Sequence, residues 1–217
     1  MKKKFVLCLV LLCVLPSMSF ATMVSGPFTT TTPIAPTLTD WAGSLQFQKF
    51  NSALGNLTMV QIDLTGSMTT VLTVTNVSST LPSSGIAETE LQITVQDSGG
   101  NLNVPEIDLL SSAFTFSNLG AGQTVVSGNL TSSGSSSKQY TAAAVLAEFT
   151  GLGTIVIVLP ASTFTQTSIG YTGGNTLASQ VTSAQLTGTV TYSYEVPEPA
   201  TMLLLGLGGL MLRKSRK

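Results

Sequence analysis

Apolar and polar residues alternate along most of the chain between residues 40 and 195. A period of two is typical of β-strands that bury one face and leave the other in solvent. Clusters of Gly, Ser, Asn and Pro, which are typical of turns, interrupt the alternation. We predict strands at residues 45–48, 57–65, 68–77, 88–96, 112–118, 123–130, 154–159 and 183–194. Gly66 and Ser67 lie between the second and third of these and predict a hairpin turn.

Short strands separated by turns indicate an all-β fold, and we expect a single antiparallel β-sandwich, jelly-roll-like or Ig-like, with residues 40–195 as the domain. Only residues 141–149 have the Ala-rich composition of a helix, and Gly151 follows as a stop. Residues 22–39 are rich in Thr and Pro and predict an extended leader before the domain. The Ser-rich segment 132–137 predicts a flexible loop tip.

The first 21 residues are organised as a secretory signal peptide. Lysines occupy positions 2 to 4, an apolar run extends from residue 5 to residue 15, and Ala21 ends a small-x-small cleavage pattern. We predict cleavage between Ala21 and Thr22. A lasting membrane anchor is the alternative, but the apolar run covers only about half of a bilayer core and Pro16 ends it.

Three features follow one another at residues 196–217: a Pro-Glu-Pro tripeptide, an apolar segment and a basic cluster. The processing motif is Val196, Pro197, Glu198, Pro199, Ala200 and Thr201. The basic residues are Arg213, Lys214, Arg216 and Lys217. In order, spacing and composition, this end closely resembles the PEP-CTERM sorting signal of Gram-negative bacteria. The resemblance implies recognition by an exosortase, a multi-pass membrane enzyme that cuts near the tripeptide and releases or transfers the protein outward. Ala200 stands where a Ser or Thr is expected, which leaves the cut site open.

The apolar segment from residue 200 to residue 212 predicts a short transmembrane helix. Its length of about 20 Å is less than the roughly 30 Å of a hydrocarbon core, so we expect a temporary anchor. The basic cluster should stop transfer at the cytoplasmic face. An amphipathic helix packed on the domain is disfavoured because the segment is apolar on all sides.

The body of the chain resembles the choice-anchor E family of PEP-CTERM surface proteins. The segments that carry this resemblance are Asp40-Trp41, Phe47-Gln48-Lys49-Phe50-Asn51, Leu54-Gly55-Asn56-Leu57, Val74-Thr75-Asn76, Phe149-Thr150-Gly151-Leu152-Gly153 and Tyr192-Ser193-Tyr194. The resemblance covers nearly all of residues 38–195. It implies a surface location and a β fold, and it implies no particular biochemical activity.

Charge and reactive side chains narrow the possible functions. The chain has nine Lys and Arg, ten Asp and Glu, no His and two Cys. Seven of the cations lie in the terminal segments, so the interior keeps only Lys49 and Lys138 and no nucleic-acid groove is expected. Both cysteines, Cys8 and Cys13, lie in the predicted signal peptide. A typical zinc site, a Ser-His-Asp triad and a Cys-His dyad are therefore excluded from the body, and we expect no cofactor.

Two places could bind a ligand. Trp41, the single tryptophan, is a candidate glycan contact, although a lone Trp before a first strand more often closes the end of a core. Asp97, Asn101 and Asn103 form a weak calcium candidate, because calcium prefers oxygen ligands. Their spacing does not match the helix-loop-helix calcium loop, and a hairpin turn explains them equally well.

Glu88 and Glu90 could act as a carboxylate pair for glycoside hydrolysis, since alternation places them roughly 7 Å apart on one face of a strand. A solvated outer face is the competing explanation. We therefore expect a non-enzymatic, exosortase-processed surface or extracellular matrix protein, linked to biofilm or exopolysaccharide. A carbohydrate-binding module is the alternative, and a glycoside hydrolase is a third possibility. The partners expected for a surface protein of this kind are the general secretion machinery, an exosortase and an exopolysaccharide.

Overall fold

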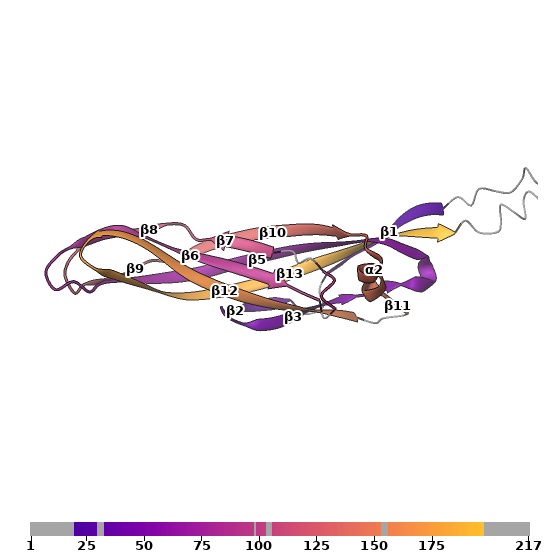
Figure 1. The fold of residues 1–217 in the computed structure, drawn as a ribbon, viewed down its shortest axis with the longest axis horizontal. Coiled ribbons are helices and arrows are strands. Elements are labelled where there is room, and N and C mark those ends of the chain that lie inside the picture. Colours follow the sequence, from indigo (N-terminus) through magenta and orange to yellow (C-terminus); the bar gives the residue numbers. More distant parts are fainter. Residues whose placement is uncertain (1–19, 30–32, 98, 103–105, 153–155, 198–217) are drawn as a thin grey trace, which may run out of the picture.

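The computed structural model describes residues 20–29, 33–97, 99–102, 106–152 and 156–197. Its two antiparallel sheets and one short α-helix confirm the predicted β-sandwich. Figure 1 shows an elongated domain in which the long strands of both layers run lengthwise. The predicted signal peptide lies outside the described residues except for Phe20 and Ala21, and the predicted transmembrane segment at residues 200–212 lies wholly outside them. No helix in the described part of the chain is long and apolar enough to cross a membrane.

The first sheet has six strands in the order β1-β13-β5-β10, with β2 also paired to β13 and β9 to β5. Its strands are β1 (Phe20–Thr29), β2 (Ile34–Leu38), β5 (Asn56–Asn76), β9 (Thr124–Val126), β10 (Leu130–Tyr140) and β13 (Thr176–Pro197). The long antiparallel pair of β5 and β13 forms the centre of this sheet.

The second sheet has five strands in the order β3-β12-β6-β7, with β8 also paired to β6. Its strands are β3 (Ala42–Gln48), β6 (Ser83–Val95), β7 (Glu106–Leu110), β8 (Phe114–Leu119) and β12 (Val156–Gly173). In β6 and β12 buried and exposed residues alternate, so one face of the sheet packs on the core and the other faces solvent.

The helix α2 (Ala143–Phe149) confirms the predicted helical segment. It buries Val145 and Phe149 near the end of the sandwich where β1 and β13 meet (Figure 1). Three further elements are short: β4 (Phe50–Asn51), the 3-10 helix η1 (Ser52–Leu54) and β11 (Thr150–Gly151), which directly follows α2. The strands β4 and β11 pair in parallel and fasten this end of the domain.

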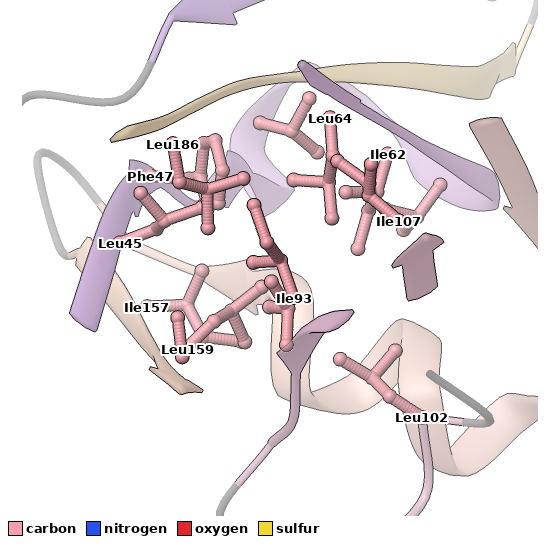
Figure 2. Packing of buried hydrophobic residues seen from close by; sticks show 14 of the residues in the cluster. Leu45, Phe47, Ile62, Leu64, Ile93, Leu102, Ile107, Ile157, Leu159 and Leu186 are labelled. Atoms are coloured by element: carbon pink, nitrogen blue, oxygen red, sulfur yellow. The ribbon is translucent and has the colours of Figure 1, made fainter. Parts of the chain in front are cut away.

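Apolar side chains from the two sheets meet in a large core cluster, part of which is seen in Figure 2. Phe47 of β3 and Ile62 and Leu64 of β5 are almost fully buried in it. A second, smaller cluster at the opposite end consists of Leu72, Val74, Ala87, Phe116 and Leu119. The domain therefore has two apolar clusters within one sandwich.

Threonines separate the two clusters. The hydroxyl oxygen of Thr70 in β5 lies 2.7 Å from that of Thr182 in β13 and 3.3 Å from that of Thr89 in β6. Thr182 in turn donates to Gln180 Oε1 at 3.2 Å. This order lets Thr70 donate to Thr182 and Thr89 donate to Thr70, so each buried hydroxyl has an acceptor.

The hairpin expected at Gly66 and Ser67 is wrong, because both residues lie inside the uninterrupted strand β5. Gly66 is buried, and a Cβ there would lie 2.7 Å from Ile93 Cδ1 and 3.3 Å from Ile107 Cδ1 of the opposite sheet. The glycine allows the two sheets to approach closely at this point.

The expected extended leader and the expected loop tip both contain strands of the first sheet. Residues 22–39, expected to precede the domain, contribute most of β1 and all of β2, which both pair with β13. Phe28 of β1 packs against the large core, with its ring 5.8 Å from that of Tyr192. Residues 132–137, expected to be a loop tip, lie in β10 and pair with β5. In both places a partner strand overrides a sequence with weak local preference for strand.

Candidate functional site

The two ends of the domain lie side by side in one β-ribbon. β1 and β13 are antiparallel, and the register pairs Ala21 with Val196 and Thr22 with Glu195. The predicted signal-peptide cleavage site, between Ala21 and Thr22, is thus next to Val196, the first residue of the processing motif. Figure 1 shows both strands leaving the same end of the sandwich.

The described part of β13 reaches Pro197, so Val196 and Pro197 are the part of the processing motif that the structure places. Glu198, Pro199, Ala200 and Thr201 lie outside the described residues, as do the basic residues Arg213, Lys214, Arg216 and Lys217. Glu195 and Val196 are half-buried in the ribbon, and Val196 packs against the large core. The described strand β13 therefore includes the first proline of the motif.

A second candidate is the outer face of the five-stranded sheet. Register pairs Phe164 of β12 with Gln92 of β6, and Gln92 with Asp108 of β7. One step along, Gln166 is paired with Glu90. These side chains, with Leu110, line an open hollow of about 470 Å³. The hollow brings together an aromatic ring, two carboxylates and two carboxamides.

Phe164 was not singled out from the sequence, and the signal that could have found it is the alternation itself. Val156, Val158 and Phe164 occupy the same parity in β12, and all three are exposed. A continuous strand from residue 156 onward would have placed the phenyl ring on the solvent face.

Trp41, the candidate glycan contact, lies at the side of the large core cluster. It is half-buried and packs against the large core cluster. Its backbone N–H donates to Thr163 Oγ1 at 3.3 Å, and its carbonyl accepts from the Thr163 N–H at 3.2 Å. Its indole Nε1 is buried and has no hydrogen-bond partner among the described residues.

The carboxylate of Asp97 is engaged within its own loop. It accepts the backbone N–H of Asn101 at 2.8 Å and of Leu102 at 3.2 Å. Burial by itself would raise the pKa of Asp97, but these backbone donors outweigh it and the pKa lies below its usual value. Asn101 Nδ2 also donates to Glu148 of α2. The loop is thereby joined to the helix.

Asn103, the third residue of the calcium candidate, lies outside the described residues. Within the part of the chain that the structure describes, no group of three or more Asp, Glu, Cys or His side chains is placed to hold a metal ion. Glu88 and Glu90 both lie on the outer face of β6, as the sequence predicts, and of the two only Glu90 lines the hollow.

Two tyrosines sit at the terminal end of the large core. Tyr192 Oη donates to the Gln48 carbonyl at 2.6 Å, and burial raises the pKa of Tyr192. Burial, with a smaller contribution from the charge of Asp97, raises the pKa of Tyr140 to about 12. Both phenols are therefore neutral at physiological pH, and neither has the lowered pKa of an activated nucleophile.

The C-terminal segment, which begins in this ribbon, matches a known protein-sorting signal. Residues 195–217 match the PEP-CTERM protein-sorting motif. The match indicates an exported protein that is processed by an exosortase and held by a C-terminal membrane anchor before cleavage. It covers the C-terminal signal and overlaps the sandwich only at the last residues of β13.

Comparison of the sequence with curated proteins gives no match. Among solved structures, chains of infectious bursal disease virus, Gx and Gt strains, align with 93% of this chain at 10% and 9% identity. The TM-scores are 0.12 and 0.11, and 50% of each viral chain is covered. The present chain thus spans about half the length of these chains, and TM-scores this low establish no shared fold.

The PEP-CTERM signal and the sandwich overlap at the ribbon. Glu195 and Val196 belong both to the sorting motif and to β13, and they pair with Thr22 and Ala21. The signal therefore begins inside the folded domain, without a linker before it. A cut after Val196 removes Pro197, the partner of Phe20, and leaves the pairing from Thr22 and Glu195 inward intact.

Proposed function

We propose that this protein is a non-enzymatic surface or extracellular matrix protein with a structural or interaction role. The general secretion machinery carries it across the inner membrane of a Gram-negative bacterium, the C-terminal segment holds it briefly, and an exosortase releases it or transfers it to the surface. The PEP-CTERM match at residues 195–217 is the observation that carries the proposal. A role in biofilm or exopolysaccharide matrix is part of it.

Two properties of the body support an extracellular role. Outside the predicted signal peptide the chain has no Cys, so the mature domain has no thiol to oxidise or cross-link. The interior carries an excess of acidic residues and a surface of Ser and Thr, which favours solubility. We also propose that the sandwich belongs to the choice-anchor E type of body, on the segments that resemble that family.

The experiment is a measurement of intact mass. Protein is recovered separately from cell envelope and culture medium of the native host, with and without an active exosortase. We expect a C-terminus between Pro197 and Thr201 that depends on the enzyme. Retention of Arg213 to Lys217 in the membrane fraction of exosortase-active cells would overturn the proposal of a temporary anchor.

Two variants sharpen this measurement. Pro199→Ala removes half of the proline pair and should leave the C-terminal segment attached. Ala200→Ser is the matched control, because it restores the residue type expected after the second proline and should be processed normally. Equal processing of both variants would show that the tripeptide does not direct the cut.

The non-enzymatic role has its own test. A hydrolase would use Glu88 and Glu90, and turnover of a polysaccharide by the purified protein, lost in Glu88→Gln or Glu90→Gln, would replace the proposal. A carbohydrate-binding module is the second candidate function, and the hollow beside Phe164 favours it.

A further inference from the structure

We propose that the outer face of the five-stranded sheet around Phe164 binds a neutral polysaccharide chain. This inference rests on the proposed extracellular role and gives it a ligand class and a site. The site consists of Phe164 and Gln166 on β12, Glu90 and Gln92 on β6, and Asp108 on β7, and we call it the Phe164 face.

The phenyl ring is the apolar surface of this site. Phe164 is 62% exposed, whereas the phenylalanines at positions 47, 50 and 149 are almost completely buried. The C–H groups on one side of a pyranose ring pack well on an aromatic ring, so an exposed phenyl ring on a rigid strand suits a sugar. Leu110, 51% exposed, adds apolar surface on the far strand of the hollow.

Hydrogen-bonding groups surround the ring. Gln92 Nε2 donates to Asp108 Oδ1 at 3.3 Å, which fixes both side chains on the face. The other amide hydrogen of Gln92 and the second oxygen of Asp108 can still serve a ligand. Glu90 and Gln166 offer the same combination one step along the strands. Sugar hydroxyls both donate and accept, so alternating carboxylates and carboxamides match them.

The dimensions fit a chain of sugars. Neighbouring strands lie about 4.8 Å apart and residues on one face of a strand about 6.8 Å apart. The row from Phe164 through Gln92 to Asp108 therefore spans about 10 Å, and the row from Gln166 to Glu90 lies beside it. The hollow of about 470 Å³ falls within the range of ligand sites, and its open form lets a polymer pass through.

The charges select among polymers. The ionisable side chains on this face are carboxylates: Glu88 and Glu90 on β6, and Glu106 and Asp108 on β7. Lys49 follows β3 and Lys138 lies in β10 of the other sheet, so neither interior cation lines the hollow. Acidic polysaccharides and anionic lipid surfaces would be repelled. Two copies of this face would repel each other in the same way, whereas a neutral chain meets no such repulsion.

The test uses the protein in the form recovered from membrane or medium, with polysaccharides immobilised separately. The neutral probes are hydroxyethyl cellulose, laminarin and mannan, and the acidic probe is alginate. We expect retention on at least one neutral probe and none on alginate. Phe164→Ala should weaken that binding by about tenfold or more, and Asp108→Asn should weaken it less. Val158→Ala, at an exposed position of the same strand and face, is the matched control and should bind normally.

Several results would overturn the inference: retention on none of the neutral probes, equal retention on alginate, or unchanged binding by Phe164→Ala. A concentration-dependent dimer that Phe164→Ala abolishes would instead assign the face to a second copy of the chain. Thermal melting of each variant confirms that it is folded. The intact mass of Phe164→Ala should still show exosortase processing, so a failure of binding and a failure of the proposed sorting are distinguishable.

Discussion

The end of the sandwich that carries both chain ends is filled with large side chains, whereas the opposite end depends on hydrogen bonds around a few turns. At the terminal end, the rings of Phe50 and Tyr194 lie 5.0 Å apart, and Phe149 and Tyr192 6.4 Å apart. At the far end the buried apolar cluster has five residues. The same alternation of apolar and polar residues thus produces two differently stabilised regions.

Asn76 is the centre of the far end. Its Nδ2 donates to the carbonyl of Leu81 at 2.7 Å and to that of Leu119 at 2.9 Å, while its Oδ1 accepts from the Ser78 N–H at 3.0 Å. One buried side chain therefore connects the turn between the two sheets to the end of β8. A small apolar cluster can therefore be compensated by a buried polar residue whose hydrogen bonds are all made.

The largest effect should come from a cavity in the large core cluster at the terminal end. Phe47→Ala removes a side chain that is fully buried between the sheets, and we expect a loss of about 3–5 kcal/mol in the free energy of unfolding, measured with urea. Phe116→Ala, beside an open hollow at the far end, should cost about 1 kcal/mol less because its surroundings can collapse more easily. Equal losses would contradict the difference between the two ends.

A change at the far end should come next. Asn76→Ala leaves the Leu81 and Leu119 carbonyls without their donor, and we expect a loss of about 2–3 kcal/mol in the free energy of unfolding. Hydrogen exchange should speed up first in the turn from residue 77 to residue 82, while the terminal core stays protected. Uniformly faster exchange over the whole domain would show that the two ends do not open separately.

The threonines between the clusters should have a smaller effect. Thr70→Val leaves the buried Thr89 hydroxyl without an acceptor and should cost about 1–2 kcal/mol. Replacing Thr70, Thr89 and Thr182 together by valine removes the unsatisfied group and should cost less than the single change. Urea unfolding of both variants gives this ranking directly, and a triple variant less stable than Thr70→Val would refute the hydrogen-bond order.

The smallest effect should appear at alkaline pH. The raised pKa of Tyr140, about 12 against about 10 in an unfolded chain, means that its contribution is present below pH 10 and is lost as the pH rises toward 12. At pH 10.5 the loss from this residue should be below about 1 kcal/mol. Urea unfolding at pH 8 and pH 10.5 measures it, and Tyr140→Phe should lose less stability between the two values than the unchanged protein.

The helix and strands such as β3, β6 and β8 could be read from the sequence because alternation and Ala-rich propensity are local signals, whereas β2, β7 and β10 were missed. The continuation of β5 through Gly66 could not be read, because nothing local separates a glycine at a hairpin from one that makes room for Ile93 of the facing sheet. Strand β1 was missed for a related reason. Its residues are largely exposed, and only pairing with β13 makes them a strand.

The sorting motif was readable because its parts are consecutive in the chain, whereas the Phe164 face is assembled from three strands. Pro160 also concealed it by suggesting that the strand ends at residue 159. In the structure β12 continues through Pro160, whose carbonyl accepts from the Gln96 N–H at 2.8 Å just beyond the end of β6. Pro160 has no N–H to donate, and this is tolerated because the strand pairing between β12 and β6 has already ended at this point.

The pairing of β13 with β5 along most of its length also determines how the domain responds to force. A pull on the C-terminus while the protein is still held in the membrane acts along the axis of β13. The hydrogen bonds to β5 and β1 then bear the load together, in shear, and do not open one after another. A sandwich pulled through this strand is therefore expected to stay folded under load.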